Sequence, residues 1–148
     1  MNKFMHMAIL EARKGIRNGH GGPFGAVIVK DGEIVAKAHN SVIRDNDPTC
    51  HGEMTAIRRA CKKIGSFDLS GCEIYTTGAP CPMCMAAIRW ANIGKVFYGC
   101  NTEDAARIGF RDQYFYETAR EKIGVELDHA DCLALYDEYR NMADKTPY

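Results

Sequence analysis

The chain is predicted to fold as a single α/β domain, a three-layer α/β/α sandwich around a mixed sheet. Two observations lead to this class. An apolar segment and an alternating segment flank Asp31-Gly32, a strong signal for a two-residue hairpin and therefore for an antiparallel strand pair. Further along, short apolar segments alternate with helical patterns, which indicates β-α units with helices on both sides of the sheet. The length of 148 residues is the common size of one domain, so residues 1–148 are expected to form one unit.

The first half of the chain supplies a helix, a hairpin and a second helix. Residues 5–16 carry apolar side chains at helical spacing, and glycine and asparagine follow them. Strands are expected at residues 25–30 and 33–39, on either side of the hairpin turn. A turn at residues 45–49, which contains a proline, leads into a helix from residue 51 to about residue 64.

The second half is expected to continue the sheet and to end in a helix. Its expected elements are a strand at 73–77, a helix from 82 to about 92, a strand at 95–100, a helical turn at 102–106 and a helix from 132 to about 145. The aromatic stretch at 110–116 has no clear period, and residues 125–129 are a candidate last strand.

Two short motifs carry the chemistry. His51-Gly52-Glu53 starts one expected helix, and Pro80-Cys81-Pro82-Met83-Cys84 starts the next. A catalytic zinc ion takes three protein ligands and leaves one position for water, and His51, Cys81 and Cys84 give that count. Cysteines in the first turn of a helix are stabilised as thiolates, and their spacing places both sulfurs on one face. The combination of His-x-Glu with Pro-Cys-x-x-Cys is the pattern of zinc-dependent deaminases, so one Zn²⁺ per chain is expected.

Glu53 is the expected general acid and base. Deamination requires a proton to be taken from water, one to be placed on the ring and one to be given to the leaving amine. A single mobile carboxylate can serve all three transfers, and Glu53 lies two residues after His51. An acidic side chain at a helix start also interacts favourably with the helix dipole, and this role is compatible with the catalytic one.

With further segments, these motifs resemble the cytidine deaminase superfamily, and within it the bacterial guanine deaminase branch. The resemblance covers nearly the whole chain and implies a cytidine deaminase-like fold with conversion of a purine base, guanine, to xanthine and ammonia. The further segments that carry it are Gly22-Pro23-Phe24-Gly25-Ala26-Val27-Ile28-Val29, Asn46-Asp47-Pro48-Thr49, Trp90-Ala91, Gly109-Phe110-Arg111-Asp112 and the aromatic end Tyr148.

The same resemblance implies the residues that contact the substrate. Asn40 is expected to hydrogen-bond the purine, and the backbone N–H of Gly52 to contact its carbonyl edge. Phe24 and Trp90 are expected to form apolar walls. In family members alanine usually stands where this chain has Gly52.

Two further roles come from the resemblance. Asp112 is expected to help to relay protons, and Tyr148 to close the pocket. A homodimer is expected, with the C-terminal segment exchanged so that Tyr148 reaches the partner's site. Other departures from the family pattern are Ala79, where many members carry glutamate, and Arg89 and Arg111, which differ from guanine deaminase.

Composition limits the partners. The 19 basic and 19 acidic residues balance, so no overall field attracts nucleic acid, and a neutral small molecule is the expected partner. The resemblance implies that this small molecule is a purine. No apolar run is long enough to span a membrane. The first residues lack the features of a secretory signal, and a cytoplasmic location is expected.

Alternative enzymes with the same motifs are tRNA-adenosine deaminase and cytosine or guanosine deaminase.

A non-enzymatic alternative is a binding module with a structural zinc ion. Cys81 and Cys84 could combine with His129-x-x-Cys132, whose spacing is compatible with a closed four-ligand site. Glu53 would then have no catalytic role.

Overall fold

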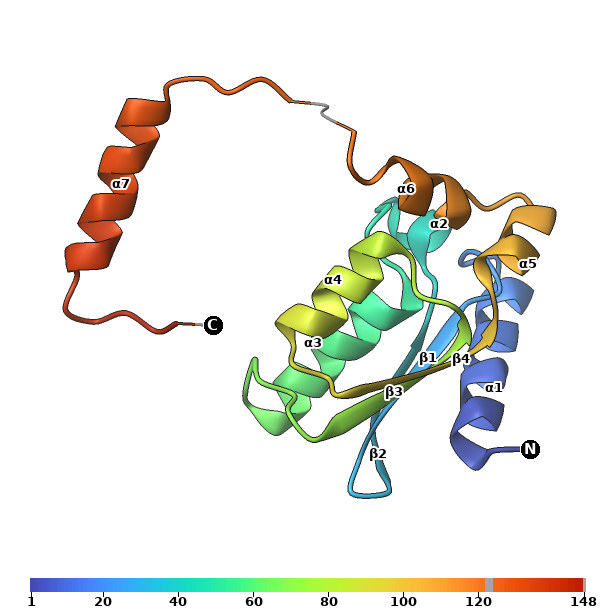
Figure 1. Ribbon diagram of the computed structural model, residues 1–148. Helices are drawn as coiled ribbons and strands as arrows, with labels where there is room; N and C mark the ends of the chain where they lie inside the picture. Colours follow the sequence, from blue (N-terminus) through green and yellow to red (C-terminus); the bar gives the residue numbers. More distant parts are fainter. Residues whose placement is uncertain (122–123, 148) are drawn as a thin grey trace.

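The fold is known from a computed structural model, which describes residues 1–121 and 124–147. Figure 1 shows helices on both sides of a central sheet, with α7 held apart from these layers. The described elements, in chain order, are α1 (Lys3–Arg17), β1 (Gly25–Lys30), β2 (Glu33–His39), α2 (Val42–Asp45), α3 (Gly52–Ile64), β3 (Cys72–Gly78), α4 (Pro82–Trp90), β4 (Lys95–Cys100), α5 (Thr102–Arg107), α6 (Asp112–Thr118) and α7 (His129–Asn141).

The sheet has the mixed topology that the sequence predicts. Among the described residues four strands pair in the order β2-β1-β3-β4. β1 is antiparallel to both β2 and β3, whereas β3 and β4 are parallel. Asp31 and Gly32 both have positive φ, 51° and 78°, as a tight primed hairpin turn requires. The prediction of an α/β sandwich with a mixed sheet is confirmed.

Successive side chains of β1 point to opposite faces of the sheet and pack against two different helical layers. Val27 and Val29 face α1 and pack with Ala8, whereas Ala26 and Ile28 face α3 and α4. All five side chains are fully buried. Because successive strand residues point to opposite faces, a strand buried on both faces needs helices above and below it. Figure 1 shows this arrangement, with α1 on one side and α3 with α4 on the other.

The expected strand at residues 125–129 is wrong. This segment has no strand pairing in the structure, and Val125 is 92% exposed. It lies away from the sheet (Figure 1), so no neighbouring strand is available for its backbone hydrogen bonds. The ambiguous stretch at 110–116 becomes the start of α6, and the last helix begins earlier than expected, at His129. The short helix α2 was not predicted. None of the described helices has the length and apolarity that crossing a bilayer demands.

Candidate metal centre and substrate pocket

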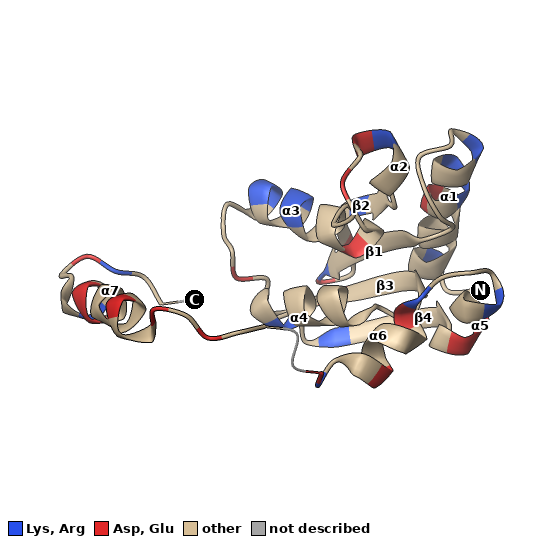
Figure 2. Cartoon of the chain, turned by 90° about the horizontal axis from the view of Figure 1, so that it is seen from above, with Lys and Arg blue, Asp and Glu red and all other residues tan. Residues whose placement is uncertain are grey.

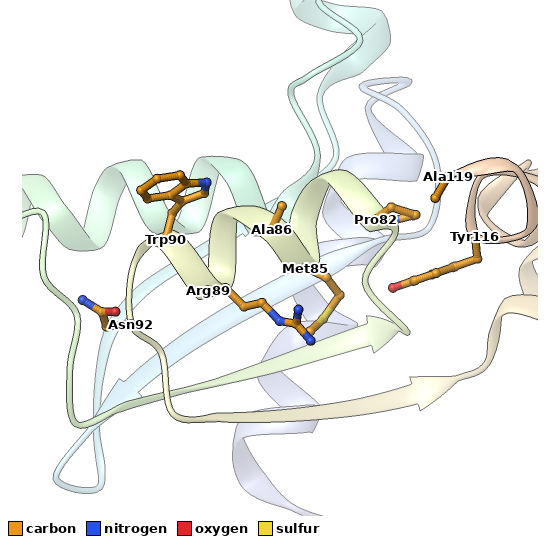
Figure 3. Close-up of a pocket in the computed structure, with 8 residues that line it drawn as sticks. All are labelled: Pro82, Met85, Ala86, Arg89, Trp90, Asn92, Tyr116 and Ala119. Atoms are coloured by element: carbon orange, nitrogen blue, oxygen red, sulfur yellow. The ribbon is translucent and has the colours of Figure 1, made fainter. Parts of the chain in front are cut away.

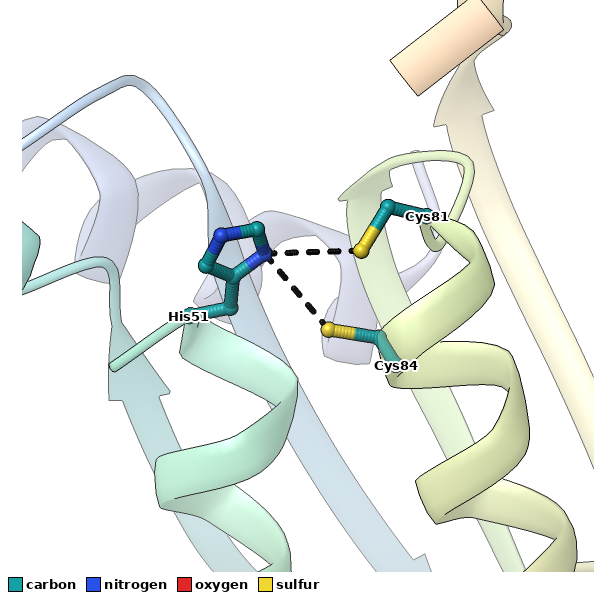
Figure 4. Close-up of side chains that lie close together, drawn as sticks. All are labelled: His51, Cys81 and Cys84. Carbon is teal, nitrogen blue, oxygen red and sulfur yellow. Dashed lines mark hydrogen bonds between the residues drawn. The ribbon is translucent and has the colours of Figure 1, made fainter. Parts of the chain in front are cut away.

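The starts of α3 and α4 meet on one face of the sheet. His51 is the N-cap residue of α3 and Cys81 is the N-cap residue of α4, and neither side chain makes a capping hydrogen bond. Both side chains instead point into the space between the two helices, together with Cys84 from the first turn of α4 (Figure 4). The structure therefore brings together the three residues of the predicted zinc site.

The distances between these side chains suit a tetrahedral zinc ion. His51 Nδ1 lies 3.6 Å from the sulfur of Cys81 and 3.6 Å from the sulfur of Cys84. Bonds of about 2.0–2.1 Å from zinc to nitrogen and about 2.3 Å to sulfur, at tetrahedral angles, place such atoms about 3.6 Å apart. All three ligand atoms lie within 4.8 Å of one another. The donor set and its geometry therefore fit zinc with one further position.

The electrostatics of the cluster favour a bound cation. The pKa of Cys81 is lowered to about 4, chiefly because the Cys84 thiol donates a hydrogen bond to it, and His51 adds to the effect. The same interaction between Cys81 and His51 raises the pKa of the imidazole. The Cys84 pKa is raised, first by the neighbouring Cys81 sulfur. Without a metal the two sulfurs are therefore not both thiolates at neutral pH. A bound metal ion would hold both of them as thiolates.

Glu53 lies beside the cluster in the first turn of α3. Its side chain is buried, with 6% exposed, and it interacts with the Cys84 thiol. Burial raises the pKa of this carboxyl to about 7. A buried carboxyl with a pKa near neutrality, next to a metal site, is suited to both accepting and donating a proton.

Asp112 approaches the cluster from α6. It is the first residue of that helix and is half-buried, and burial and the charge of Cys81 raise the pKa of its carboxyl. The Tyr116 hydroxyl, on the same helix, donates a 2.6 Å hydrogen bond to the backbone oxygen of Pro80, directly before Cys81. Tyr116 was missed at the sequence level, although its spacing of four residues from Asp112 places both on one helix face.

Three of the predicted substrate contacts lie together at one end of the sheet. The backbone oxygen of Phe24 accepts a 2.8 Å hydrogen bond from the backbone nitrogen of Asn40. The same oxygen faces Gly52, where a Cβ atom would lie 3.1 Å from it. The Phe24 ring packs edge-on against Phe110, with centroids 4.7 Å apart. Phe110 is therefore a second aromatic residue at this end. It belongs to the Gly109-Phe110-Arg111-Asp112 segment that carries the resemblance, but no contact was predicted for it.

Trp90 does not join this group. Trp90 is the last residue of α4 and lies six positions after Cys84, which is about 9 Å along a helix. Its side chain is 66% exposed and lines a hollow on the outer face of α4, as Figure 3 shows. Tyr148 lies outside the described residues.

The alternative site with His129 and Cys132 is not assembled. Both residues are exposed on α7, which Figures 1 and 2 show apart from α4. Across residues 1–121 and 124–147, His51, Cys81 and Cys84 are the group with metal-ligand geometry. The structure therefore gives no support to a closed four-ligand zinc site.

Comparisons with known proteins give the same family as the motifs. Residues 1–100 match the cytidine and deoxycytidylate deaminase zinc-binding region. The chain is 44% identical to the guanine deaminase of Bacillus subtilis, over 98% of this chain and 97% of that protein. The crystal structure of that enzyme superposes with a TM-score of 0.94, covering 100% of this chain and 99% of the other, at 42% identity. A tRNA-specific adenosine deaminase of Aquifex aeolicus is 46% identical over 64% of this chain and 62% of its own length.

Proposed function

The chain belongs to the cytidine and deoxycytidylate deaminase family, and on that premise we propose that it is a zinc-dependent guanine deaminase, which converts guanine and water to xanthine and ammonia. The observation that carries the proposal is the convergence of His51, Cys81 and Cys84 at two helix starts, with Glu53 buried beside them. The similarity to guanine deaminase along nearly the full length of the chain is the reason for proposing guanine as the substrate.

His51, Cys81 and Cys84 would hold one zinc ion per chain. Bound zinc supplies a water molecule whose pKa is lowered towards about 7, so that the nucleophile is available at neutral pH. Glu53 would accept a proton from the attacking water and place it on a ring nitrogen of guanine as the water oxygen bonds to C2. Glu53 would then move the remaining proton of the added hydroxyl to the amine, so that the C2–N bond breaks and ammonia leaves. The products balance one guanine and one water.

The purine would bind at the end of β1 and β2. Asn40, the backbone N–H of Gly52 and the ring of Phe24 are grouped there, and we propose that they hold the base with its C2 amine towards Glu53. We propose that Asp112, the first residue of α6, relays protons between the site and water, and its nearness to Cys81 and His51 supports this role.

We also propose a homodimer in which the C-terminal arm, residues 124–148, crosses to the partner subunit. The described part of this arm exposes apolar side chains, among them Leu135 at 60% and Tyr136 at 70%. The body offers a hollow of about 640 Å³ between α4 and α6, lined by Pro82, Met85, Ala86, Arg89, Trp90, Asn92, Tyr116 and Ala119 (Figure 3). Large exposed apolar surfaces on both parts favour their mutual burial. Trp90 and Tyr148 would then join the pocket through the dimer.

Light scattering at micromolar concentration tests the dimer, and a monomer of full activity would contradict it. Deletion of Tyr148 is expected to lower guanine turnover more than it lowers the melting temperature, because it removes a pocket wall and not a core residue.

A tRNA-specific adenosine deaminase is the second candidate, because the Aquifex relative shares the zinc region. That similarity stops at about two thirds of the chain. Two of the four basic residues of α3, the helix that Figure 2 shows with blue basic segments, have structural partners: Arg59 donates to the backbone oxygen of Lys37 and Lys63 to that of Ile34. They stabilise β2, so a role in binding a polyanion is not needed to explain them.

The substrate experiment compares specificity constants for guanine, guanosine, adenine, cytosine, cytidine and an anticodon stem by ammonia release. We expect guanine to be the best substrate and the stem to be inert. A substrate at least tenfold better than guanine would replace the assignment. None of the seven cysteines is paired in a disulfide in the part of the chain that the structure describes, which supports a reducing compartment and hence a cytoplasmic enzyme.

A further inference from the structure

A row of three titratable side chains, of which Glu11 and His39 are buried and His20 is half-buried, lies outside the metal centre. Glu11 of α1 and His39 of β2 are each 8% exposed, and Glu11 Oε2 lies 3.0 Å from His39 Nδ1. His39 Nε2 in turn lies 2.9 Å from Nδ1 of His20, and the two rings stack with centroids 5.2 Å apart. Both ring nitrogens of His39 are thus engaged, so its imidazole is fixed in one orientation.

The three side chains lie on either side of Asn40. His39 directly precedes Asn40, and the loop that carries His20 packs against it, since a Cβ atom on Gly21 would collide with the Asn40 side-chain oxygen. The backbone oxygen of His20 also accepts hydrogen bonds from Ile43 at 3.0 Å and Arg44 at 3.1 Å. The loop is therefore joined to β2 through the His20 ring and to α2 through the His20 backbone, and Asn40 lies between these two attachments.

The Asn40 amide is oriented by its own contacts. Its side-chain oxygen accepts a 3.1 Å hydrogen bond from the backbone nitrogen of Val42. Because the oxygen is used in this way, the NH₂ group is the end that can donate to an acceptor on a purine ring. Among the described residues no hydrogen bond from this NH₂ group is present.

His39 also borders the second expected purine contact. A Cβ atom on Gly52 would lie 3.5 Å from the His39 Cα atom. The position of the β2 end therefore sets the place of both the Asn40 amide and the first turn of α3.

We propose that Glu11, His39 and His20 form a positioning network for purine recognition, which holds Asn40 in the geometry that binds the base. This rests on the proposed function, because it assumes that Asn40 contacts the purine. The network does not touch the reacting atoms, so its loss raises KM and leaves kcat and zinc content nearly unchanged.

The test begins with Glu11→Met, which removes the acceptor of His39 and keeps the side-chain length. A buried hydrogen bond to a charged group contributes enough that we expect KM for guanine to rise about tenfold, with kcat within about twofold of wild type. Glu11→Gln retains an acceptor oxygen and is expected to restore most of the affinity. Lys37→Met is the matched control: Lys37 approaches the same carboxylate at 3.7 Å but is 47% exposed, so its removal should leave KM unchanged.

Double variants that also change Asn40 distinguish a positioning role of the network from a general effect on stability. If the network acts through Asn40, Glu11→Met adds little to the KM of Asn40→Ala, whereas independent effects multiply. His20→Leu changes a half-buried residue at the outer end of the network and provides the same comparison should Glu11→Met fold poorly. If the effects on KM multiply fully in the double variants, and Asn40→Ala itself raises KM, the network is overturned and the proposed function stands. Unchanged KM in Asn40→Ala would overturn both the purine contact and the network, and absence of guanine turnover in the wild type would overturn the proposed function itself.

Discussion

Replacement of Cys84 by alanine tests the metal centre most directly. Cys84 is fully buried, and its sulfur is one of the two that lie 3.6 Å from His51 Nδ1. The substitution leaves one imidazole and one thiol, which cannot complete a three-ligand site. Cys100→Ala is the matched control, since Cys100 is an exposed free thiol outside the cluster.

The expected loss can be worked from the ligand count. Structural zinc sites with four ligands bind with about 10–16 kcal/mol, or about 3 kcal/mol for each ligand. Removal of one ligand should therefore weaken zinc binding by about two orders of magnitude. Because the proposed mechanism takes its water from this site, ammonia release should fall together with zinc occupancy.

Competition between the protein and a chromogenic zinc chelator measures this affinity. We expect wild type and Cys100→Ala to retain one zinc per chain at a chelator concentration that strips Cys84→Ala. An unchanged zinc affinity in Cys84→Ala, with undiminished deamination, would refute the assignment of the three ligands.

Three further predictions concern Glu53, α6 and the contact between α1 and β1. Glu53→Gln should keep zinc and fold but lose about 10²- to 10⁴-fold in kcat, because an amide cannot accept the proton from water; activity within tenfold of wild type would remove Glu53 from the mechanism. Tyr116→Phe removes the hydroxyl that holds α6 to the loop before α4 and should lower kcat about tenfold at unchanged zinc content, whereas Tyr114→Phe, at an exposed position, should resemble wild type. Gly25→Ala would drive a Cβ atom into the α1 backbone and should cost about 3 kcal/mol of stability, whereas Gly94→Ala meets no atom within 4 Å and should leave the melting temperature unchanged.

The sequence predicted the elements best where local chemistry decides the structure. The strands at 25–30 and 33–39 have the observed bounds because Asp31-Gly32 supports the positive φ angles of the turn and the flanking residues suit buried strands. The segment at 125–129 has similar residues, but a strand also needs a hydrogen-bonding neighbour, and that requirement is set by tertiary structure.

The same distinction explains which site residues could be foreseen. His51, Cys81 and Cys84 lie at helix starts, where motif spacing fixes their direction, so their convergence followed from the fold class. The pairing of Glu11 with His39 crosses from α1 to β2. In a helical pattern Glu11 is simply a polar residue, and only the packing of the two layers shows that it is buried.

Gly52 shows how closely the elements approach at the substrate end of the sheet. Gly52 has no side chain, and it is buried in the first turn of a regular helix. Its Cα faces the Phe24 backbone oxygen, which also accepts from Asn40. Alanine would bring a Cβ atom to 3.1 Å from that oxygen, closer than ordinary van der Waals contact, so β1 or α3 would have to move. Glycine therefore permits α3 to start closer to the ends of β1 and β2, and this departure from the family pattern lies where the proposed purine contacts, Phe24 and Asn40, come together.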